Sequence, residues 1–551
     1  MKKGLSEKIS NGIKTIKSNW QTAPEGSYVP YKEIAAYSVG GAGVYFIISI
    51  VGMISLSASS MIVGASIGIK AMDLQTMNVI TTLIMLLIAP TRAMLFDNTK
   101  SKMGKFRPYI LTLGVPTAII GTVFVYLPYE SMGYNQKLIA VFVGYTLLQF
   151  FSPFYQTAYL SLVNVMSANS KERSWIIEIS SIIYSFAPTV INPVLPLIGP
   201  LENIKTYRIG FPIFCVLGVI VSMLCVFGTK ERIIVPKQYV QKMGFFEGLK
   251  KVSKNKYFWI INSSTWIGFL NQGYSYLFQW VFYYGMKNNG LYSLLTVIRG
   301  EAYTPGMAIA APLTNKLGKR KVCLLSLGIQ TLACVIMLFF YENYILFFAC
   351  MFIKDMASAL AIIYLPAMKA DMMDYQQYKT GDRLEGFIEQ GGVLIGSLLG
   401  LVTGYAFPLI FKAYGFTNNY DDLFNTDFRN PLVRIVIICS IIGTLISIIP
   451  FLFYDLSEEK RKNMITALKI RAMFADFDNA DFDNSLIQEN LQFVFEAEKI
   501  CNELSGYTTK QDKEKYLGAK IVCEEVEKLK AENMEKWNNI IEKYQRQVEA
   551  K

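Results

Sequence analysis

Charged residues inside apolar segments are the first candidates for chemistry in this sequence. Arg299 and Glu301 lie in one long apolar run, and Lys354 and Asp355 lie in another. A charge at the centre of a membrane costs about 2.5 to 3.5 kcal/mol on insertion scales, so such groups are expected to pair and to serve a function. We expect Asp355 to pair with Arg299. Lys354 faces another way on its helix and is expected to pair with Glu301 or Glu389, the alternative being purely structural pairs that lock two helices.

Amide and aromatic side chains form a second group of candidates. They combine hydrogen-bonding atoms with flat apolar faces, which suits a small polar solute such as a sugar. Amides that face lipid are unfavourable, so the deeper ones are expected to face a cavity, although aromatic residues also belt membrane interfaces. The candidate binding residues are Tyr45, Gln149, Gln156, Asn271, Gln272, Tyr276, Gln279 and Trp280.

The residue types that the sequence lacks limit its chemistry. The chain contains no histidine, which excludes Ser-His-Asp and Cys-His catalysis and histidine-ligated metals. Its eight cysteines are scattered without a CxxC pair and are expected to be core residues, neither metal ligands nor disulfides. No constellation of nucleophile and base appears, so we expect neither an enzyme nor a metal site or cofactor.

The composition indicates the elements that must position these residues. With 551 residues, of which 52% are hydrophobic and 17% charged, the chain is too apolar for a soluble enzyme of its length. A helix needs about 20 apolar residues to cross a bilayer, and this criterion predicts an all-α integral membrane protein. Twelve transmembrane helices are predicted near 34–57, 73–96, 108–127, 137–163, 174–198, 208–228, 257–285, 291–314, 322–341, 343–366, 384–411 and 432–454.

The positive charges predict the orientation. The net charge of +12 falls mostly in alternate loops between the apolar runs, which indicates one side of a membrane and not a nucleic-acid site. Loops rich in lysine and arginine stay in the cytoplasm, so both termini are predicted on the cytoplasmic side of the cell (plasma) membrane. The predicted domains are a cytoplasmic N-terminus (1–33), two six-helix halves (34–228 and 257–454), a cytoplasmic linker between them (229–256) and a cytoplasmic helical tail (455–551).

A short repeat indicates that the two halves are related. Residues 101–107 (SKMGKFR) recur as 315–321 (NKLGKRK), between the second and third predicted helices of each half. Gly104 permits an otherwise strained turn in the first copy. Duplicated six-helix halves around a site at the membrane midplane are typical of carriers that work by alternating access.

Two longer motifs carry a family resemblance. Residues 97–109 (DNTKSKMGKFRPY) and 370–386 (ADMMDYQQYKTGDRLEG) resemble the motifs of the glycoside-pentoside-hexuronide:cation symporters, the melibiose permease group of the major facilitator superfamily. The resemblance implies the major facilitator fold, carbohydrate transport by symport, and a cytoplasmic gate of opposite charges at helix ends. Glu178 is predicted near the cytoplasmic opening and is added to this gate. The expected gate residues are Asp97, Lys100, Arg107, Glu178, Asp371, Asp374, Arg383 and Glu385.

The chain departs from this family where its carriers hold the coupling cation. The resemblance implies acids in helices one, two and four, an arginine in helix five and a lysine in helix eleven. Carboxylate oxygens are needed for a sodium site, and if none is present the site is absent or has moved. Proton coupling remains available if Glu301, Glu389 or Asp355 titrates. The positions that correspond to the family's charges fall near Tyr45, Met85, Ala89, Gln156, Ser181 and Ser397, none of which is charged.

The segment 455–551 differs in character from the rest of the chain. It is rich in Glu and Lys, with apolar residues at helical spacing, which predicts a soluble helical appendage that has a cytoplasmic partner. We interpret the whole chain as a secondary active transporter that moves a sugar, a glycoside or a related small polar solute with H⁺ or Na⁺. The alternatives are an uncoupled or non-sugar carrier of the same fold, and a transporter-like membrane sensor that signals through the tail.

Overall fold

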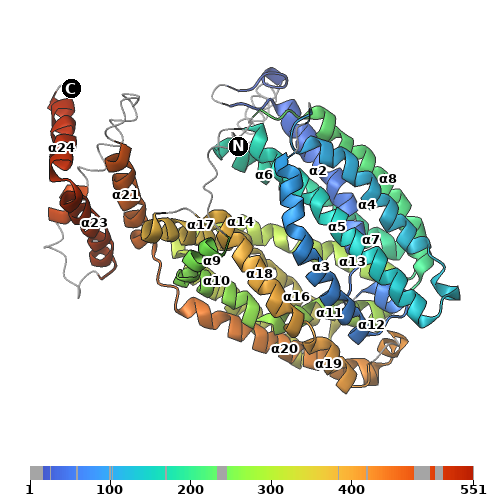
Figure 1. Ribbon diagram of the computed structural model, residues 1–551. Helices are drawn as coiled ribbons and strands as arrows, with labels where there is room; N and C mark the ends of the chain where they lie inside the picture. The colour runs from blue at the N-terminus through green and yellow to red at the C-terminus, as the bar shows by residue number, and fades with distance from the viewer. Residues whose placement is uncertain are drawn as a thin grey trace, which may run out of the picture.

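The structure, a computed structural model, is helical in all its regular elements. It describes residues 17–24, 27–57, 60–98, 101, 103–167, 170–232, 245–381, 384–416, 420–476, 497–502 and 513–549. Within these ranges every regular element is an α-helix or a short helical turn (Figure 1). The predicted all-α class is therefore confirmed.

The first half of the chain forms a bundle of long helices. Its elements are α2 (Tyr31–Gly52), η1 (Met61–Ser66), α3 (Ala71–Asn98), α4 (Arg107–Tyr126), η2 (Tyr129–Ser131), α5 (Tyr134–Met166), α6 (Ser170–Tyr184), α7 (Phe186–Ile198) and α8 (Ile204–Gly228). Helices α2 and α8 approach each other closely at Gly43, where the lack of a side chain permits it. A Cβ atom on Gly43 would lie 2.3 Å from the backbone nitrogen of Ser222.

The second half begins with the short helix α9 (Phe245–Ser253) and forms a second bundle. Several of its helices are divided into consecutive pieces. Its further elements are α10 (Lys256–Ile267), η4 (Phe269–Gly273), α11 (Tyr274–Phe278), η5 (Gln279–Tyr283), α12 (Tyr284–Met286), α13 (Asn289–Gly300), α14 (Tyr303–Leu317), α15 (Lys319–Phe339), α16 (Tyr344–Ala359), α17 (Ala361–Thr380), α18 (Glu385–Thr403), α19 (Ala406–Ala413), η6 (Tyr420–Phe424) and α20 (Thr426–Leu452).

The described residues contain ten helical stretches that are long and apolar enough to cross a membrane, judged by length and composition. These stretches match ten of the predicted spans. The other two predicted spans, 257–285 and 291–314, are each divided into shorter helices, α10 to α12 and α13 to α14. The total of twelve spans therefore stays a prediction.

The first of these divided spans is broken where its backbone packs against α20. A Cβ atom on Gly268 would lie 1.8 Å from Ser447 Oγ and 3.0 Å from the carbonyl oxygen of Gly443. Gly443 in turn lies against the backbone of Asn271, where an added Cβ atom would be 2.4 Å from the amide nitrogen. This close approach fixes the tighter turn η4, and it places the amides of Asn271 and Gln272 at the break.

We call the end of the bundles where α2 begins and α20 ends the terminal end, and the opposite end the distal end. The two halves are packed together at the distal end. Ser293 Oγ in α13 donates a hydrogen bond to the carbonyl oxygen of Pro193 in α7 at 2.5 Å. The backbone N–H of Leu201 donates to Tyr283 Oη at 2.8 Å, and the Tyr283 hydroxyl donates to the Glu202 carboxylate.

The apolar cores differ between the two ends. One continuous core joins residues of the first half to distal-end residues of the second half, including those of η5 and α12. At the terminal end, the described core of the second half contains no residue of the first half. The two groups of helices accordingly lie together near α12 and α13 and diverge toward α6 and α17 (Figure 1).

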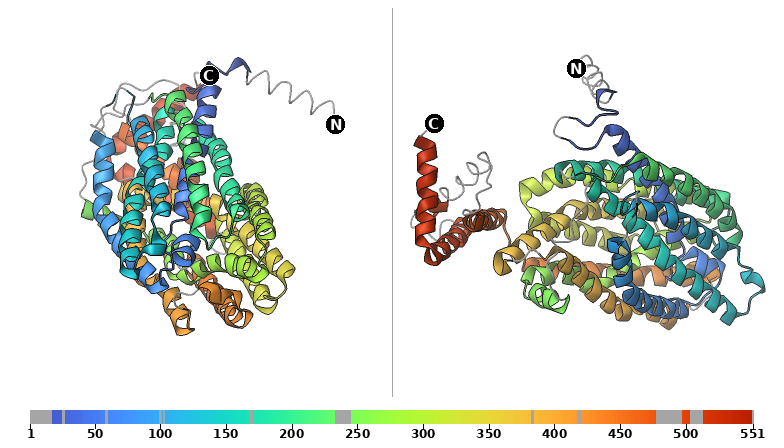
Figure 2. Two further views of the ribbon diagram at one scale, coloured as in Figure 1. Left: turned by 90° about the vertical axis from the view of Figure 1, so that its right-hand side faces the viewer. Right: turned by 45° about the horizontal axis from the view of Figure 1, so that its top comes forward.

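The end of the chain forms a helical unit that packs against the terminal end of α17 (Figure 2). Its helices are α21 (Glu458–Asp476), α23 (Lys513–Glu532) and α24 (Met534–Glu549). They share a small core that includes Ile470, Val522 and Trp537. Arg471 Nε lies 2.7 Å from Glu525 Oε1, which links α21 to α23.

Candidate substrate cavity and charged clusters

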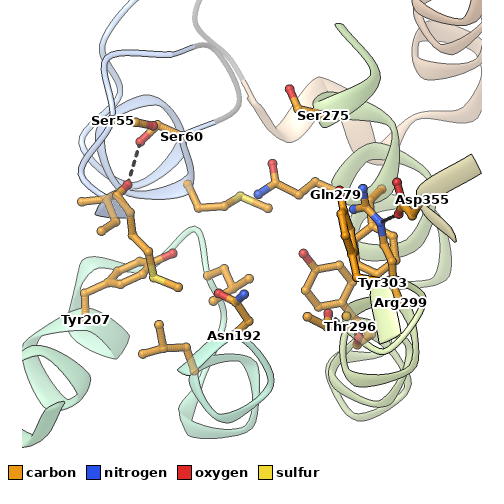
Figure 3. Close-up of a pocket in the computed structure, with 18 residues that line it drawn as sticks. Ser55, Ser60, Asn192, Tyr207, Ser275, Gln279, Thr296, Arg299, Tyr303 and Asp355 are labelled. Carbon is orange, nitrogen blue, oxygen red and sulfur yellow. Dashed lines mark hydrogen bonds and ion pairs between the residues drawn. The ribbon is translucent and has the colours of Figure 1, made fainter. Parts of the chain in front are cut away.

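A cavity of about 420 Å³ lies between the two halves. Its wall combines hydroxyl, amide and charged groups with apolar side chains from η1, α7 and α8 on one side and from α11, η5, α13 and α16 on the other (Figure 3). This volume falls within the range of about 300 to 1,000 Å³ that is usual for small-molecule sites. The polar lining residues are Ser55, Ser60, Asn192, Tyr207, Ser275, Gln279, Tyr292, Thr296, Arg299, Tyr303 and Asp355.

The predicted pair of Arg299 and Asp355 is present in the wall of this cavity. Arg299 Nε donates to Asp355 Oδ2 at 2.6 Å, and the Asp355 side chain is 5% exposed (Figure 3). The guanidinium carbon of Arg299 also lies 4.8 Å from the ring centre of Phe278. Because Arg299 is in the last turn of α13, its charge also stabilises the negative end of the helix dipole.

Lys354 does not pair with Glu301, the first of its two predicted partners. Lys354 Nζ lies 3.5 Å from the ring centre of Tyr274, so its partner is an aromatic face. Glu301 is exposed at the break between α13 and α14, where it accepts a hydrogen bond from Thr304 Oγ1 at 3.1 Å. The Glu389 side chain lies outside the described residues, so the pairing of Lys354 with Glu389 stays a prediction.

The predicted binding residues are divided among several places. Gln279 lines the central cavity. Gln272 and Tyr276 line a second cavity of about 370 Å³. Trp280 lines neither and is packed in an aromatic cluster, with its ring centre 5.1 Å from that of Phe411.

The remaining predicted binding residues do not line these two cavities. Gln156 Nε2 donates to Tyr45 Oη at 3.3 Å, and Tyr45 stacks on Tyr184 with ring centres 3.9 Å apart. Gln149 hydrogen-bonds to Tyr145. The Oδ1 atom of Asn271 is buried without a partner among the described residues. These side chains therefore satisfy one another or pack at the helix break.

Sequence reasoning missed four polar residues of the cavity wall in the first half, namely Ser55, Ser60, Asn192 and Tyr207. Asn192 lies in α7, a helix that contains Pro193 and Pro196, and Tyr207 lies near the start of α8. An amide beside a proline in an apolar segment is the signal that predicts such a position, because proline opens the helix at a place where polar groups gather.

The glycine turn of the first motif has the predicted conformation but an unexpected partner. Gly104 has a φ of +106°, and a Cβ atom there would lie 2.4 Å from Glu231 Cδ. The Glu231 carboxylate accepts hydrogen bonds from the backbone N–H groups of Lys105, Phe106 and Arg107 at 2.7, 2.9 and 3.0 Å. It therefore caps the start of α4 from the residues that follow α8.

The expected gate is only partly described. Arg107 donates from Nε to the carbonyl oxygen of Val226 at 2.7 Å and from Nη1 to that of Met103 at 3.2 Å, so it closes the same turn. Asp374 lies half-buried on α17. Five expected gate residues have side chains that lie outside the described part of the chain, namely Asp97, Lys100, Glu178, Arg383 and Glu385.

Asp371, another expected gate residue, is paired with cations from outside its motif. Its side chain is 1% exposed, and Lys319 Nζ lies 2.6 Å from Oδ2. Arg461 Nε of α21 lies 2.7 Å from Oδ1, as an ion pair without the alignment of a hydrogen bond. Tyr454 Oη donates to Oδ2 at 3.4 Å. Asp371 therefore joins the repeat loop of the second half to the first helix of the tail.

In each half an ion pair joins the segment after the last helix to the start of the first helix. Arg232 Nη2 lies 2.7 Å from Glu33 Oε1 of α2. Lys256 Nζ of α10 lies 2.7 Å from Asp455 Oδ1, which follows α20. The two ion pairs occupy corresponding places at the terminal end of each half.

The second of these ion pairs predicts a pH dependence of stability. Burial alone would raise the pKa of Asp455, but hydrogen bonds from Lys256 and Tyr257 and the charge of Lys460 lower it from 3.8 to about 2. The stabilising contribution is therefore complete above about pH 4 and is lost as the pH falls toward 2. Because the Asp455 side chain is 50% exposed, we expect at most about 1 kcal/mol.

The measurement compares the unfolding temperatures of the wild type and Asp455→Asn in detergent across pH. The difference should be constant from pH 8 to 5 and shrink below pH 4. A difference that grows as the pH falls would contradict the lowered pKa.

Two bundles of apolar helices around a polar, charged cavity define a multi-pass membrane transporter. The sequence model described as "MFS/sugar transport protein" matches residues 36–458. The inner membrane symporter YicJ of Escherichia coli K12 is 25% identical over 412 residues, 73% of this chain and 87% of that protein. The isoprimeverose transporter of Lactiplantibacillus pentosus is 23% identical over 415 residues, 72% and 83% of the two chains.

The chain therefore belongs to the MFS/sugar transport family, and the predicted membership of the glycoside-pentoside-hexuronide group is confirmed. A bacterial homologue of the human lysosomal transporter Spinster has the same fold, with a TM-score of 0.52 and 15% identity over 77% of this chain and 96% of that one. These relatives are membrane transporters and not enzymes.

Proposed function

We propose that this protein is a secondary active transporter that carries a sugar, a glycoside or a related small polar solute by alternating access. The observation that carries the proposal is the cavity between the halves, with the buried ion pair of Arg299 and Asp355 in its wall. Amides and hydroxyls can bind the hydroxyl groups of a sugar, and Phe278 and Tyr303 offer flat faces to its ring. The relative named as an isoprimeverose transporter supports this substrate class.

The terminal end is cytoplasmic in this proposal, and the protein lies in the cell membrane. The lysines and arginines of the loops 97–107 and 315–321 support this orientation. With the halves joined at the distal end, the arrangement corresponds to the inward-facing state. The distal contacts of Ser293 and Tyr283 would then break when the carrier opens to the outside.

Asp355 is the proposed coupling acid. It is the one carboxylate among the described residues that line the central cavity. Protonation would release Arg299 from its ion pair and free both groups for the substrate, so binding of a proton and binding of a sugar would be linked at one pair of side chains. This coupling would use an acid in the second half, in contrast to the first-half acids implied for the family.

The test is uptake of labelled sugars into proteoliposomes with a proton gradient, with a sodium gradient, and with neither. We expect the proton gradient to drive accumulation of at least one disaccharide. Uptake that ignores both gradients would identify an uncoupled carrier, and no uptake of any sugar would favour a non-sugar solute. Loss of coupling in Glu301→Gln would move the coupling acid to the helix break.

A second candidate function is a membrane sensor that signals through the tail to a cytoplasmic partner. The contact that favours it is Arg461 of α21 at the buried Asp371, because a change of state at α17 would reach the tail directly. Deletion of 456–551 separates the two functions. Unchanged uptake with a lost regulatory phenotype would favour the sensor.

A further inference from the structure

A second cavity lies beside α11, next to the central cavity. It has a volume of about 370 Å³ and is bounded by α3, η4, α18 and α19. Both cavities are lined by Ser275, and the segment before η1 contributes Ser55 to the first and Ser57 to the second. The two cavities are therefore neighbours along the boundary between the halves.

The wall of the second cavity is polar but uncharged. No lysine, arginine, aspartate or glutamate is among the described residues that line it, whereas the central cavity contains Arg299 and Asp355. Phe269, Tyr276 and Phe407 add aromatic faces. The amide and hydroxyl groups of the wall include Gln75, Asn78, Thr82, Gln272, Ser397 and Thr403.

Gln75 is a buried amide in this wall with an unpaired donor. Its side chain is 7% exposed, and its Nε2 atom has no hydrogen-bond partner among the described residues. A buried amide donor without an acceptor is costly, and a polar molecule in the cavity would compensate it once the amide turns toward that molecule.

The backbone of α18 ends against this amide. A Cβ atom on Gly404 would lie 2.2 Å from Gln75 Nε2, so a glycine is needed there to leave the amide in its place. Gln75 Nε2 is thus covered by the backbone at Gly404, while the Gln75 residue as a whole lines the cavity beside Asn78 and Gln272.

We propose that this second cavity is a subsite for a neutral sugar ring, so that the substrate is a glycoside with one ring here and the remainder in the central cavity. The assignment rests on the proposed transport function. A neutral ring offers hydroxyl acceptors and donors to Gln75, Asn78 and Gln272, and its C–H face packs on Tyr276. A charged group would find no counter-ion among these lining residues and would instead bind at Arg299.

The experiment measures equilibrium binding to the full chain in nanodiscs. The probes are isoprimeverose, melibiose and lactose, each beside its component monosaccharides xylose, galactose or glucose. We expect at least one disaccharide to bind more tightly than both of its components. Gln75→Leu and Asn78→Leu should each weaken that disaccharide about tenfold, as expected for the loss of a neutral hydrogen bond, and change monosaccharide affinity less.

Gln330→Leu is the matched control, because Gln330 is a buried amide of α15 whose Nε2 donates to Ser326 Oγ and which lines neither cavity. Gly404→Ala perturbs the site without removing a polar group and should reproduce the loss if Gln75→Leu does not fold. Unchanged disaccharide affinity in Gln75→Leu and Asn78→Leu, or equal affinity of the wild type for disaccharides and monosaccharides, would overturn the subsite alone. Failure of the wild type to bind any sugar would overturn the proposed function as well.

Discussion

Replacing Asp355 by asparagine is expected to abolish gradient-driven uptake and to destabilise the protein. The substitution removes the acid that lies 2.6 Å from Arg299 and leaves that guanidinium without a counter-ion. Lys354, which is 4% exposed, loses the neighbouring negative charge as well. Removing one partner of a buried pair costs about 3 to 5 kcal/mol, because the other charge remains buried and unpaired. The measurements are uptake into proteoliposomes and unfolding temperature in detergent.

A double variant separates the functional role of this pair from a structural one. Arg299→Leu with Asp355→Leu removes both charges and should restore much of the stability, since an apolar pair of similar volume often replaces a buried ion pair without loss. It should not restore uptake, because neither a carboxylate nor a cation remains among the described residues that line the cavity. Gradient-driven uptake at the wild-type rate in the double variant would show that the pair only locks α13 to α16.

The pairing of Arg299 with Asp355 was predictable from the sequence, because opposite charges in apolar segments have few alternatives. The environment of Lys354 was not predictable in the same way. Its partner is the ring of Tyr274, and the rules of pairing acids with bases do not select among aromatic faces. Tyr274 reaches Lys354 because η4 breaks the helix before it, and that break depends on Gly268 packing against α20.

The contacts at the terminal end were also only partly predictable from the sequence. The turn at Gly104 was predictable from its motif, whereas its partner Glu231 lies more than a hundred residues further along the chain. The fold brings Glu231 back to the start of α4 only because α8 runs beside α4 and α2. A capping acid at such a sequence distance leaves no periodic pattern that could be recognised beforehand.

Long-range packing also decides the partners of Asp371. The gate predicted from the motif names no single partner for this acid, and the nearest described cations come from the repeat loop and from the tail. In the first half, Glu231 contacts the repeat loop. In the second half, Lys319 of the repeat loop contacts Asp371 and also lies 3.1 Å from Glu458 of α21. The contact between Glu458 and Lys319 thus corresponds to the contact between Glu231 and the repeat loop of the first half. In the second half the tail supplies the acid.

Asp371→Ala is expected to cause the largest loss of stability at the terminal end. Asp371 is almost completely buried, and its removal leaves Lys319 and Arg461 with the exposed carboxylate of Glu458, at 3.1 and 3.4 Å, as their described acid. We expect the free energy of unfolding to fall by about 3 kcal/mol, as for other buried pairs broken on one side. The unfolding temperature in detergent measures this loss, and protease accessibility of α21 measures whether the tail has separated from α17.

Asp455→Asn is the matched control, because it removes an acid at the same end of the same half whose side chain is half exposed. Its effect should be at most about 1 kcal/mol. Arg461→Ala extends the comparison to a double-mutant cycle with Asp371→Ala, in which residues in contact should not give additive losses. Additive losses, with α21 still protected from protease in Asp371→Ala, would mean that the tail is held by its apolar contacts. A coupled loss with α21 exposed would mean that this buried carboxylate transmits the position of α17 to the tail.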